Sequence, residues 1–171
     1  MYRQGAVGAL LDLYEQAISE IKKVIEDIPD AVLASIIDQE TTDENCKSIQ
    51  TVLSHIVSSG YSYVIYIHNI KGDKTERPRK VFYATIKEYL EDLNKMMVYT
   101  ENVFKDLKDA ELEQPDETKK INTYWQQRYD IEQLMEHAIV HLLRHKRQIE
   151  KFKMTVTTPD NPGNPENSKI L

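Results

Sequence analysis

Apolar residues recur every three to four positions along four stretches of the chain, which is the spacing of one face of an α-helix. The predicted helices span residues 7–28, 48–70, 82–108 and 129–152. The first helix ends at Pro29, because proline removes a backbone donor and crowds the preceding turn. No stretch alternates apolar and polar residues as a half-buried strand does. The pattern therefore predicts an all-α fold, a four-helix bundle.

The chain is long enough for one domain with a core of its own, since it has 171 residues. Residues 1–154 are expected to form this single bundle domain. The segment that follows, "TVTTPDNPGNPENSKIL" (155–171), contains three of the six prolines of the chain. Such a composition predicts an extended or disordered C-terminal tail.

The second half of the second predicted helix is apolar on nearly all sides. Tyr61, Ile65 and Tyr66 lie off the stripe that would face the bundle interior. A helix of this kind needs cover on more than one side, and a second copy of the chain could supply it. We therefore predict a homodimer.

Charge and composition narrow the classes of partner. The formal net charge is −6, and no dense cluster of Lys and Arg is present to neutralise phosphates, so a nucleic-acid partner is not expected. No apolar run approaches the roughly 20 residues that span a bilayer, so no membrane partner is expected. The first residues lack a signal-peptide core, and the single cysteine, Cys46, cannot form an internal disulfide. A cytoplasmic location is the resulting prediction.

The last predicted helix carries three histidines at intervals of four, His137, His141 and His145, around the stretch "HLLRHKRQI". Residues four apart are neighbours on one helical face, so a pair of them could bind one ion. His137 and His145 are roughly 12 Å apart along the axis, so the three together could not easily do so. On a helical wheel His145 falls roughly 30° from the centre of the apolar stripe, His141 roughly 70° and His137 roughly 110°. The inward pair is therefore His141 and His145.

Two interpretations of this pair stay open at this point. Both could be ordinary buried histidines that bond to side chains and backbone. Alternatively, one metal ion takes a nitrogen from each, and a third ligand comes from another helix. His55 and His68 on the second helix are the remaining histidines, and their periodicity does not choose between them.

Two segments resemble signatures of the DinB/YfiT-like superfamily. "CKSIQTVLSHIVSSGYSY" (46–63) is similar to its second-helix signature, and "DIEQLMEHAIVHLLRHKRQI" (130–149) is similar to its last-helix signature, H-x-x-x-H-x-x-Q-I. The order and length of the four helices agree with that family over roughly residues 5–153. One departure is Arg147, where the family often has a small residue before the glutamine. This change leaves the histidines untouched and alters the outer surface of the site.

The resemblance implies one divalent metal ion, most readily zinc or nickel, held by His55, His141 and His145, with His137 outside the motif. Characterised relatives are similar in using the metal to activate a low-molecular-weight thiol for transfer or isomerisation. The expected function is therefore a metal-dependent, S-transferase-like enzyme with a small-molecule substrate. A metal-dependent hydrolase and a non-catalytic stress-response or binding module on the same bundle are the alternatives.

No catalytic acid or base is assigned from the sequence. The candidates near the expected metal are Asp43, Glu44, Tyr63 and Tyr66, and each is expected to be structural or solvated. Cys46 lies near the start of the second helix, where the helix dipole could lower the pKa of its thiol. A small packing residue is the simpler interpretation of that cysteine.

Overall fold

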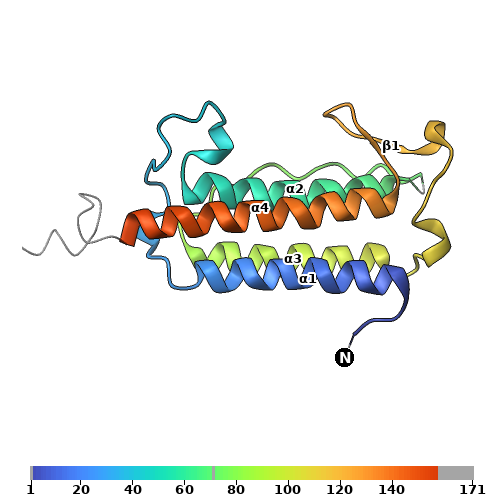
Figure 1. Cartoon of the computed structure of the whole chain (residues 1–171), viewed down its shortest axis with the longest axis horizontal. Helices are drawn as coiled ribbons and strands as arrows, with labels where there is room; N and C mark the ends of the chain where they lie inside the picture. Colours follow the sequence, from blue (N-terminus) through green and yellow to red (C-terminus); the bar gives the residue numbers. More distant parts are fainter. Residues whose placement is uncertain (1, 71, 158–171) are drawn as a thin grey trace, which may run out of the picture.

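Four long helices pack side by side along their lengths, as predicted, in a computed structural model that describes residues 2–70 and 72–157 (Figure 1). The all-α, four-helix-bundle prediction is confirmed. Within the described part of the chain, no helix is long and apolar enough to cross a membrane. The four helices are α1 (Gly5–Ile25), α2 (Ile49–Asn69), α3 (Ile86–Phe104) and α4 (Ile131–Thr157).

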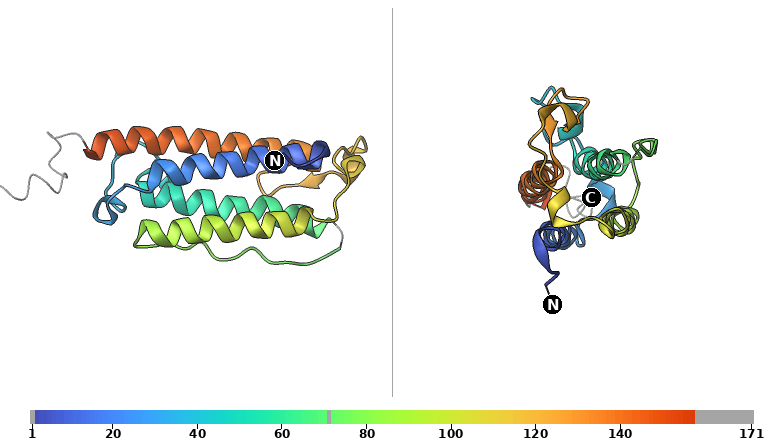
Figure 2. Two further views of the ribbon diagram at one scale, coloured as in Figure 1. Left: turned by 90° about the horizontal axis from the view of Figure 1, so that it is seen from below. Right: turned by 90° about the vertical axis from the view of Figure 1, so that its right-hand side faces the viewer.

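Helix α1 packs against α3 and α4, and α2 packs against the same two helices, so α1 and α2 lie on one diagonal of the bundle. Helices α2 and α3 run in the same direction, and α1 and α4 run in the opposite direction (Figures 1 and 2). Because α2 and α3 are parallel, the segment that connects them, residues 72–85, must return along the whole length of the bundle. We call this extended segment the strap. It runs along the outer side of α2 and α3 (Figure 2).

The structure gives shorter bounds for α3 than the predicted 82–108. Thr85 caps the helix, since its hydroxyl accepts a hydrogen bond from the backbone N–H of Glu88 while the Glu88 carboxylate accepts from the backbone N–H of Thr85. Phe82, which the apolar pattern assigned to the core face, lies in the strap and is 55% exposed. The period alone could not show that a capping pair would start the helix four residues later.

The segment predicted as a loosely ordered link, residues 108–127, is folded. It contains two short 3-10 turns and then the two-residue strand β1 (Ile121–Asn122), which pairs antiparallel with β2 (Arg128–Tyr129). The expectation of no strand was wrong here, because two-residue strands are too short to show an alternating pattern. This hairpin rises beside the start of α4 (Figure 1).

Helix α4 is longer than predicted. It continues to Thr157, so residues 155–157 of the predicted tail are helical. The rest of that tail, residues 158–171, lies outside the described residues.

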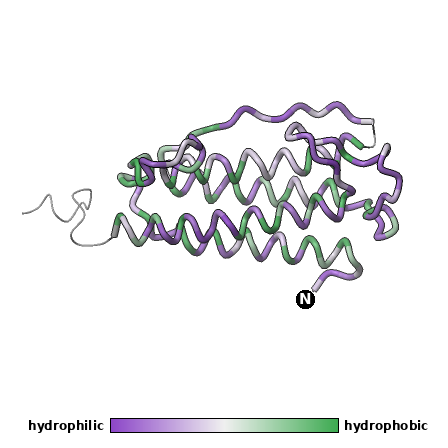
Figure 3. The backbone as a smooth tube through the Cα atoms, turned by 45° about the horizontal axis from the view of Figure 1, so that its top comes forward, coloured by the Kyte–Doolittle hydropathy of each residue, from purple (hydrophilic) through white to green (hydrophobic). Residues whose placement is uncertain are grey.

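Each helix turns its apolar residues toward the bundle axis, so green and purple alternate along the chain trace (Figure 3). The largest fully buried side chains come from α1, α2, α3 and the loops: Tyr14, Tyr89, Phe104, Ile21, Ile25, Leu33, Ile49, Leu53, Ile56, Leu93, Met96 and Leu112. Helix α4 adds the fully buried Leu134, Met135, Ala138 and Ile149 to this core. The core therefore fixes the relative position of α2 and α4, on which the site described below depends.

The face of α2 that suggested a homodimer is covered by the chain itself. Ile65 is only 7% exposed. The Tyr61 hydroxyl donates to Asp92 at 3.0 Å, and the Tyr66 hydroxyl accepts from the backbone N–H of Tyr124 in the hairpin at 2.8 Å. Burial of these side chains does not need a second subunit, so the homodimer stays a prediction.

Gly60 lies on the face of α2 that packs against Tyr14 of α1 and Met96 of α3. A Cβ at this position would lie 2.1 Å from the Met96 sulfur and 3.0 Å from the Tyr14 hydroxyl oxygen. Alanine favours a helix over glycine by about 1 kcal/mol, but overpacking a buried site costs about 1–3 kcal/mol. Met96 is fully buried, so a shift of its side chain would disturb the packed core, and Gly60→Ala is expected to lower the free energy of unfolding. Urea unfolding measures this change in the free energy of unfolding. The control Val98→Ala, at a 56% exposed position on α3, should change it by less than about 0.5 kcal/mol.

Candidate metal centre

Helices α2 and α4 lie side by side and bring three histidines into one group, His55 from α2 with His141 and His145 from α4. The Nε2 atoms of His55 and His141 are 2.9 Å apart, and those of His145 and His141 are 3.2 Å apart. One nitrogen from each ring lies within 4.8 Å of the other two. The interpretation that chose His55 over His68 as the third member of this group agrees with this geometry.

The direction of each histidine follows the helical wheel. His145 is 5% exposed and points into the bundle, and His141 is half-buried beside it. His137, one turn earlier, is also half-buried but lies outside the group of three. The interval of four residues places the His141 and His145 rings 4.4 Å apart between centroids.

The spacing of the Nε2 atoms fits one divalent metal ion. Two imidazole nitrogens bound about 2.05 Å from one zinc ion lie about 2.9 Å apart at a right angle and about 3.4 Å apart at the tetrahedral angle. The two contacts of His141 fall within this interval. Hydrogen bonds alone serve the group poorly, because the Nε2 of His141 carries either one hydrogen or one lone pair but faces two other nitrogens.

Burial keeps all three imidazoles in the neutral form that binds metals. Burial, followed by the charge of the neighbouring His145, lowers the pKa of His55 to about 4. Burial, followed by the neighbouring histidines, lowers the pKa of His141 to about 3. Burial also lowers the pKa of His145. At neutral pH the Nε2 lone pairs are therefore available without the loss of a proton.

The other ring nitrogens differ in how they are held. The Nδ1–H of His145 donates to the Gln148 side-chain oxygen at 2.9 Å, and the Gln148 amide donates to the Cys46 carbonyl at 3.4 Å. Ser59 Oγ lies 3.4 Å from Nδ1 of His55. The buried Nδ1 of His141 has no hydrogen-bond partner among the described residues. The best-oriented lone pair of the group is thus the one on His145, which Gln148 directs.

Gln148→Ala is expected to weaken zinc binding about 10–100-fold, because partners that orient a metal-binding imidazole have effects of that size. Arg147→Ala is the matched control, since Arg147 precedes Gln148 on the same helix, is exposed, and should leave the affinity unchanged. Competition titration against a chromogenic zinc chelator measures both variants. Equal affinities for the two variants would show that Gln148 does not orient a ligand.

An aromatic cluster from the hairpin and the two helices forms one wall of the site. Trp125, the single tryptophan of the chain, stacks on His137 with ring centroids 5.7 Å apart. The buried Tyr63 lies edge-on to both His137 and His141, at 5.6 and 5.7 Å. His137 therefore packs between Trp125 and His141 and is a support for the wall. The apolar pattern missed Trp125 as part of the site because it lies in the supposed link.

The remaining sequence candidates have structural partners. Burial raises the pKa of the Cys46 thiol, so the hypothesis of a reactive cysteine activated by the helix start is not supported. Glu44 is exposed and pairs with Lys47. The Tyr66 hydroxyl is used by the hairpin, as described above. Asp43 accepts a hydrogen bond from the backbone N–H of Asn45, which holds the pKa of its carboxyl below the usual value.

His68 lies outside the histidine group, near the C-terminal end of α2. Its Nδ1 is 3.0 Å from the Tyr99 hydroxyl and its Nε2 is 3.2 Å from the Asp73 carboxylate. Both ring nitrogens therefore have partners at the loop that leads into the strap.

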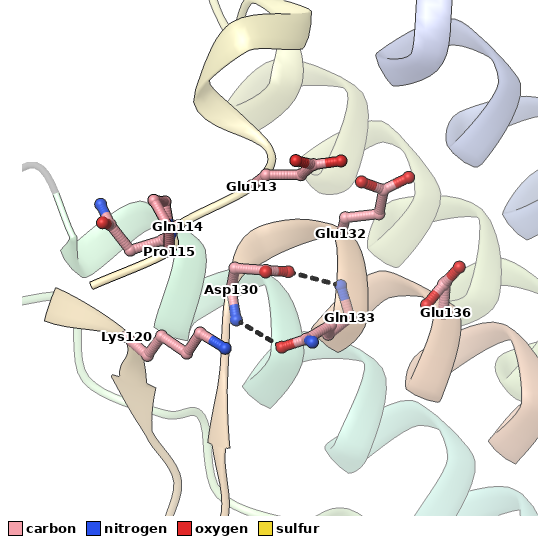
Figure 4. A pocket seen from close by; sticks show the side chains of 8 residues that line it. All are labelled: Glu113, Gln114, Pro115, Lys120, Asp130, Glu132, Gln133 and Glu136. Atoms are coloured by element: carbon pink, nitrogen blue, oxygen red, sulfur yellow. Dashed lines mark hydrogen bonds between the residues drawn. The ribbon is translucent and has the colours of Figure 1, made fainter. Parts of the chain in front are cut away.

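A pocket that shares no residue with the histidine group lies where α4 begins (Figure 4). Its floor is a helix cap, in which the Asp130 carboxylate accepts from the backbone N–H of Gln133 at 2.9 Å and the Asp130 backbone N–H donates to the Gln133 side chain at 3.1 Å. Glu113, Glu132 and Glu136 gather around it, and burial together with these neighbouring carboxylates raises the pKa of Glu132. The polar groups of the floor are thus used to start the helix.

A four-helix bundle in which three neutral imidazoles converge between two helices is a candidate metal-binding bundle protein. The model of the DinB family matches residues 1–152, so the chain belongs to the DinB family. This match confirms the resemblance drawn from the two helix signatures. No curated protein and no solved structure matches the chain.

Proposed function

We propose that the protein binds one divalent metal ion, zinc or nickel, through the Nε2 atoms of His55, His141 and His145. The observation that carries this proposal is the approach of the His141 Nε2 to two other Nε2 atoms, at 2.9 and 3.2 Å. Three imidazoles suit both ions and leave at least one coordination position open. An open position is the mark of a catalytic metal site, since structural zinc sites are fully occupied by protein ligands.

We further propose that this site activates a low-molecular-weight thiol for transfer to a small electrophilic substrate. When bound, the metal ion would supply a Lewis acid that lowers the pKa of a thiol or water molecule. The protein contributes neutral ligands buried against the bundle and an aromatic wall, formed by Tyr63 and Trp125, that excludes water from one side. The buried His145, held by Gln148, would hold the ion next to this wall.

A metal-dependent hydrolase would use the same open position to activate water. A non-catalytic binding module would bind the metal ion but catalyse neither thiol transfer nor hydrolysis. The discriminating experiment is a transfer assay with monochlorobimane and a panel of low-molecular-weight thiols, with and without a chelator. A rate above background that the chelator removes supports thiol transfer. Ester and amide hydrolysis that depends on metal, without thiol transfer, would favour the hydrolase. Metal uptake without either activity would favour the binding module.

The control for this assay is His145→Ala, which should reduce the metal-dependent rate to the background rate. His137→Ala should keep most of it, because His137 supports the wall and lies outside the group of three. A cytoplasmic location and a homodimer remain predictions from the sequence. Light scattering at high micromolar concentration decides the second of these, and a monomer there would contradict it.

A further inference from the structure

Three cationic side chains surround the histidine group without carboxylate partners. Arg77 and Lys80 come from the strap, and Arg144 lies on α4 between His141 and His145. Among the described residues, none of the three forms an ion pair. Most Lys and Arg side chains of the described residues likewise form no ion pair, so the inference depends on where these three lie relative to the histidine group. Several cations gathered beside one binding site favour an anionic ligand.

Arg77 is fixed beside the site by two contacts. Its Nη2 donates to Ser58 Oγ at 2.7 Å, and Ser58 lies on α2 one turn beyond His55. Its guanidinium carbon also lies 5.7 Å from the centre of the Tyr124 ring in the hairpin. The hydrogen bond uses one of the five N–H groups of the guanidinium, so the others remain for a carboxylate or phosphate. The strap thus delivers a pre-positioned guanidinium between α2 and the aromatic wall.

Lys80 links the strap to the loop that precedes α2. Its ammonium donates to the side-chain oxygen of Asn45, two residues from Asp43. Burial lowers the pKa of Lys80. The hydrogen bonds to Ser58 and Asn45 place Arg77 and Lys80 on the α2 side of the histidine group. The positive charges of both side chains lower the pKa of His55, in agreement with this position.

Arg144 lies on the α4 side of the histidine group. Its positive charge affects both His141 and His145, and its side chain is exposed. Asp43 is a carboxylate whose charge acts on His55 and His145 in the opposite sense. One acidic group against three cations leaves an excess of positive charge around neutral imidazoles, before any metal charge is added.

We propose that the substrate bound beside the metal is anionic, a small molecule with a carboxylate or phosphate group, and that Arg77 and Lys80 bind this group while Arg144 adds to the attraction. This inference rests on the proposed function and names the charge class of its substrate. Arg77 and Lys80 are specificity-determining residues in this account. The guanidinium offers paired N–H donors that fit either a carboxylate or a phosphate.

The test compares thiols that differ in charge. Mercaptosuccinate, 2-mercaptoethanol and cysteamine carry negative, neutral and positive substituents, and isothermal titration calorimetry measures their affinities for the zinc-loaded full-length protein. Wild-type protein is expected to bind mercaptosuccinate at least about tenfold more tightly than 2-mercaptoethanol, and cysteamine most weakly. Inorganic phosphate, titrated separately, shows whether the cations accept phosphate as well as carboxylate.

Variants of the strap test whether its two cations cause the preference for the anionic thiol. In the double variant Arg77→Gln with Lys80→Gln, the preference for mercaptosuccinate should fall to about threefold or less. Arg79→Gln is the matched control, because Arg79 lies on the same strap and forms no hydrogen bond or ion pair with the described residues, and it should keep the preference. Equal affinities for the three thiols in the wild type, or an unchanged preference in the double variant, would overturn the inference. If the double variant does not fold by circular dichroism, Arg77→Gln alone decides the same comparison.

A failure of this inference is distinguishable from a failure of the proposed function. If the protein takes up no metal, the proposed function fails, and the same titrations on the chelator-treated protein decide the inference. Binding of mercaptosuccinate that the double variant loses then supports an anion site, and absence of such binding overturns it. If metal binds normally but the thiols show no charge preference, the metal site stands and the anionic substrate is wrong.

Discussion

His145→Ala is expected to lower the affinity for zinc or nickel by more than about 100-fold, so that the purified variant contains no stoichiometric metal. His145 is the most buried of the three histidines, at 5% exposure, and Gln148 directs its Nε2 toward the group. Partners that only orient a ligand have effects of about 10–100-fold, so loss of a ligand itself should exceed them. Mass spectrometry of metal content and competition titration measure the effect.

The matched control is His137→Ala. This histidine lies four residues from His141 on the same helix, and its ring stacks at 6.4 Å from that of His141, but it lies outside the group of three. It should retain metal within about threefold of the wild-type affinity. Parallel losses in the two variants would mean that the effect comes from the aromatic wall and not from coordination.

Metal removal is expected to destabilise the folded protein substantially. An ion that binds only the folded state adds about 4 kcal/mol when its free concentration is 1,000 times the dissociation constant. For a chain of this size, each kcal/mol shifts the melting temperature by about 2–4 °C, so the expected difference is about 8–16 °C. Thermal unfolding followed by circular dichroism, with zinc and then with excess chelator, measures this shift.

The same experiment on His145→Ala provides the control, because the variant should show no zinc-dependent shift. If the wild-type melting temperature changes by less than about 2 °C across saturating zinc and chelator, the ion does not bind preferentially to the folded bundle. Such a result would contradict the account even if some metal co-purifies with the protein.

The existence of the four helices could be predicted because long helices impose a period on the sequence that local turns do not disturb. Their ends were less predictable. Thr85 and Glu88 begin α3 later than its apolar residues suggest, and Phe82 is exposed as a result. The hairpin escaped prediction because its pairing at Ile121 and Tyr129 is set by contacts between strands too short for a periodic signal.

The candidate site was also predictable only in part. The inward direction of His141 and His145 follows from their position on one helix, since the wheel depends only on local geometry. The approach of His55 depends on which face of α2 meets α4, and its own helix does not encode that pairing, so only the family resemblance indicated it. Arg77 and Trp125 reach the site through a long crossover and a hairpin, whose paths depend on tertiary packing.

X-ray absorption spectroscopy of the zinc- or nickel-loaded full-length protein tests the metal-site proposal most directly. The account predicts one ion per chain, whose first shell contains three imidazole nitrogens at about 2.0–2.1 Å. The same spectrum of His145→Ala, recorded on whatever metal it retains, should show fewer imidazole ligands. Less than a tenth of an equivalent of metal after incubation with zinc or nickel, or a first shell without imidazole, would contradict the assignment of His55, His141 and His145 as ligands.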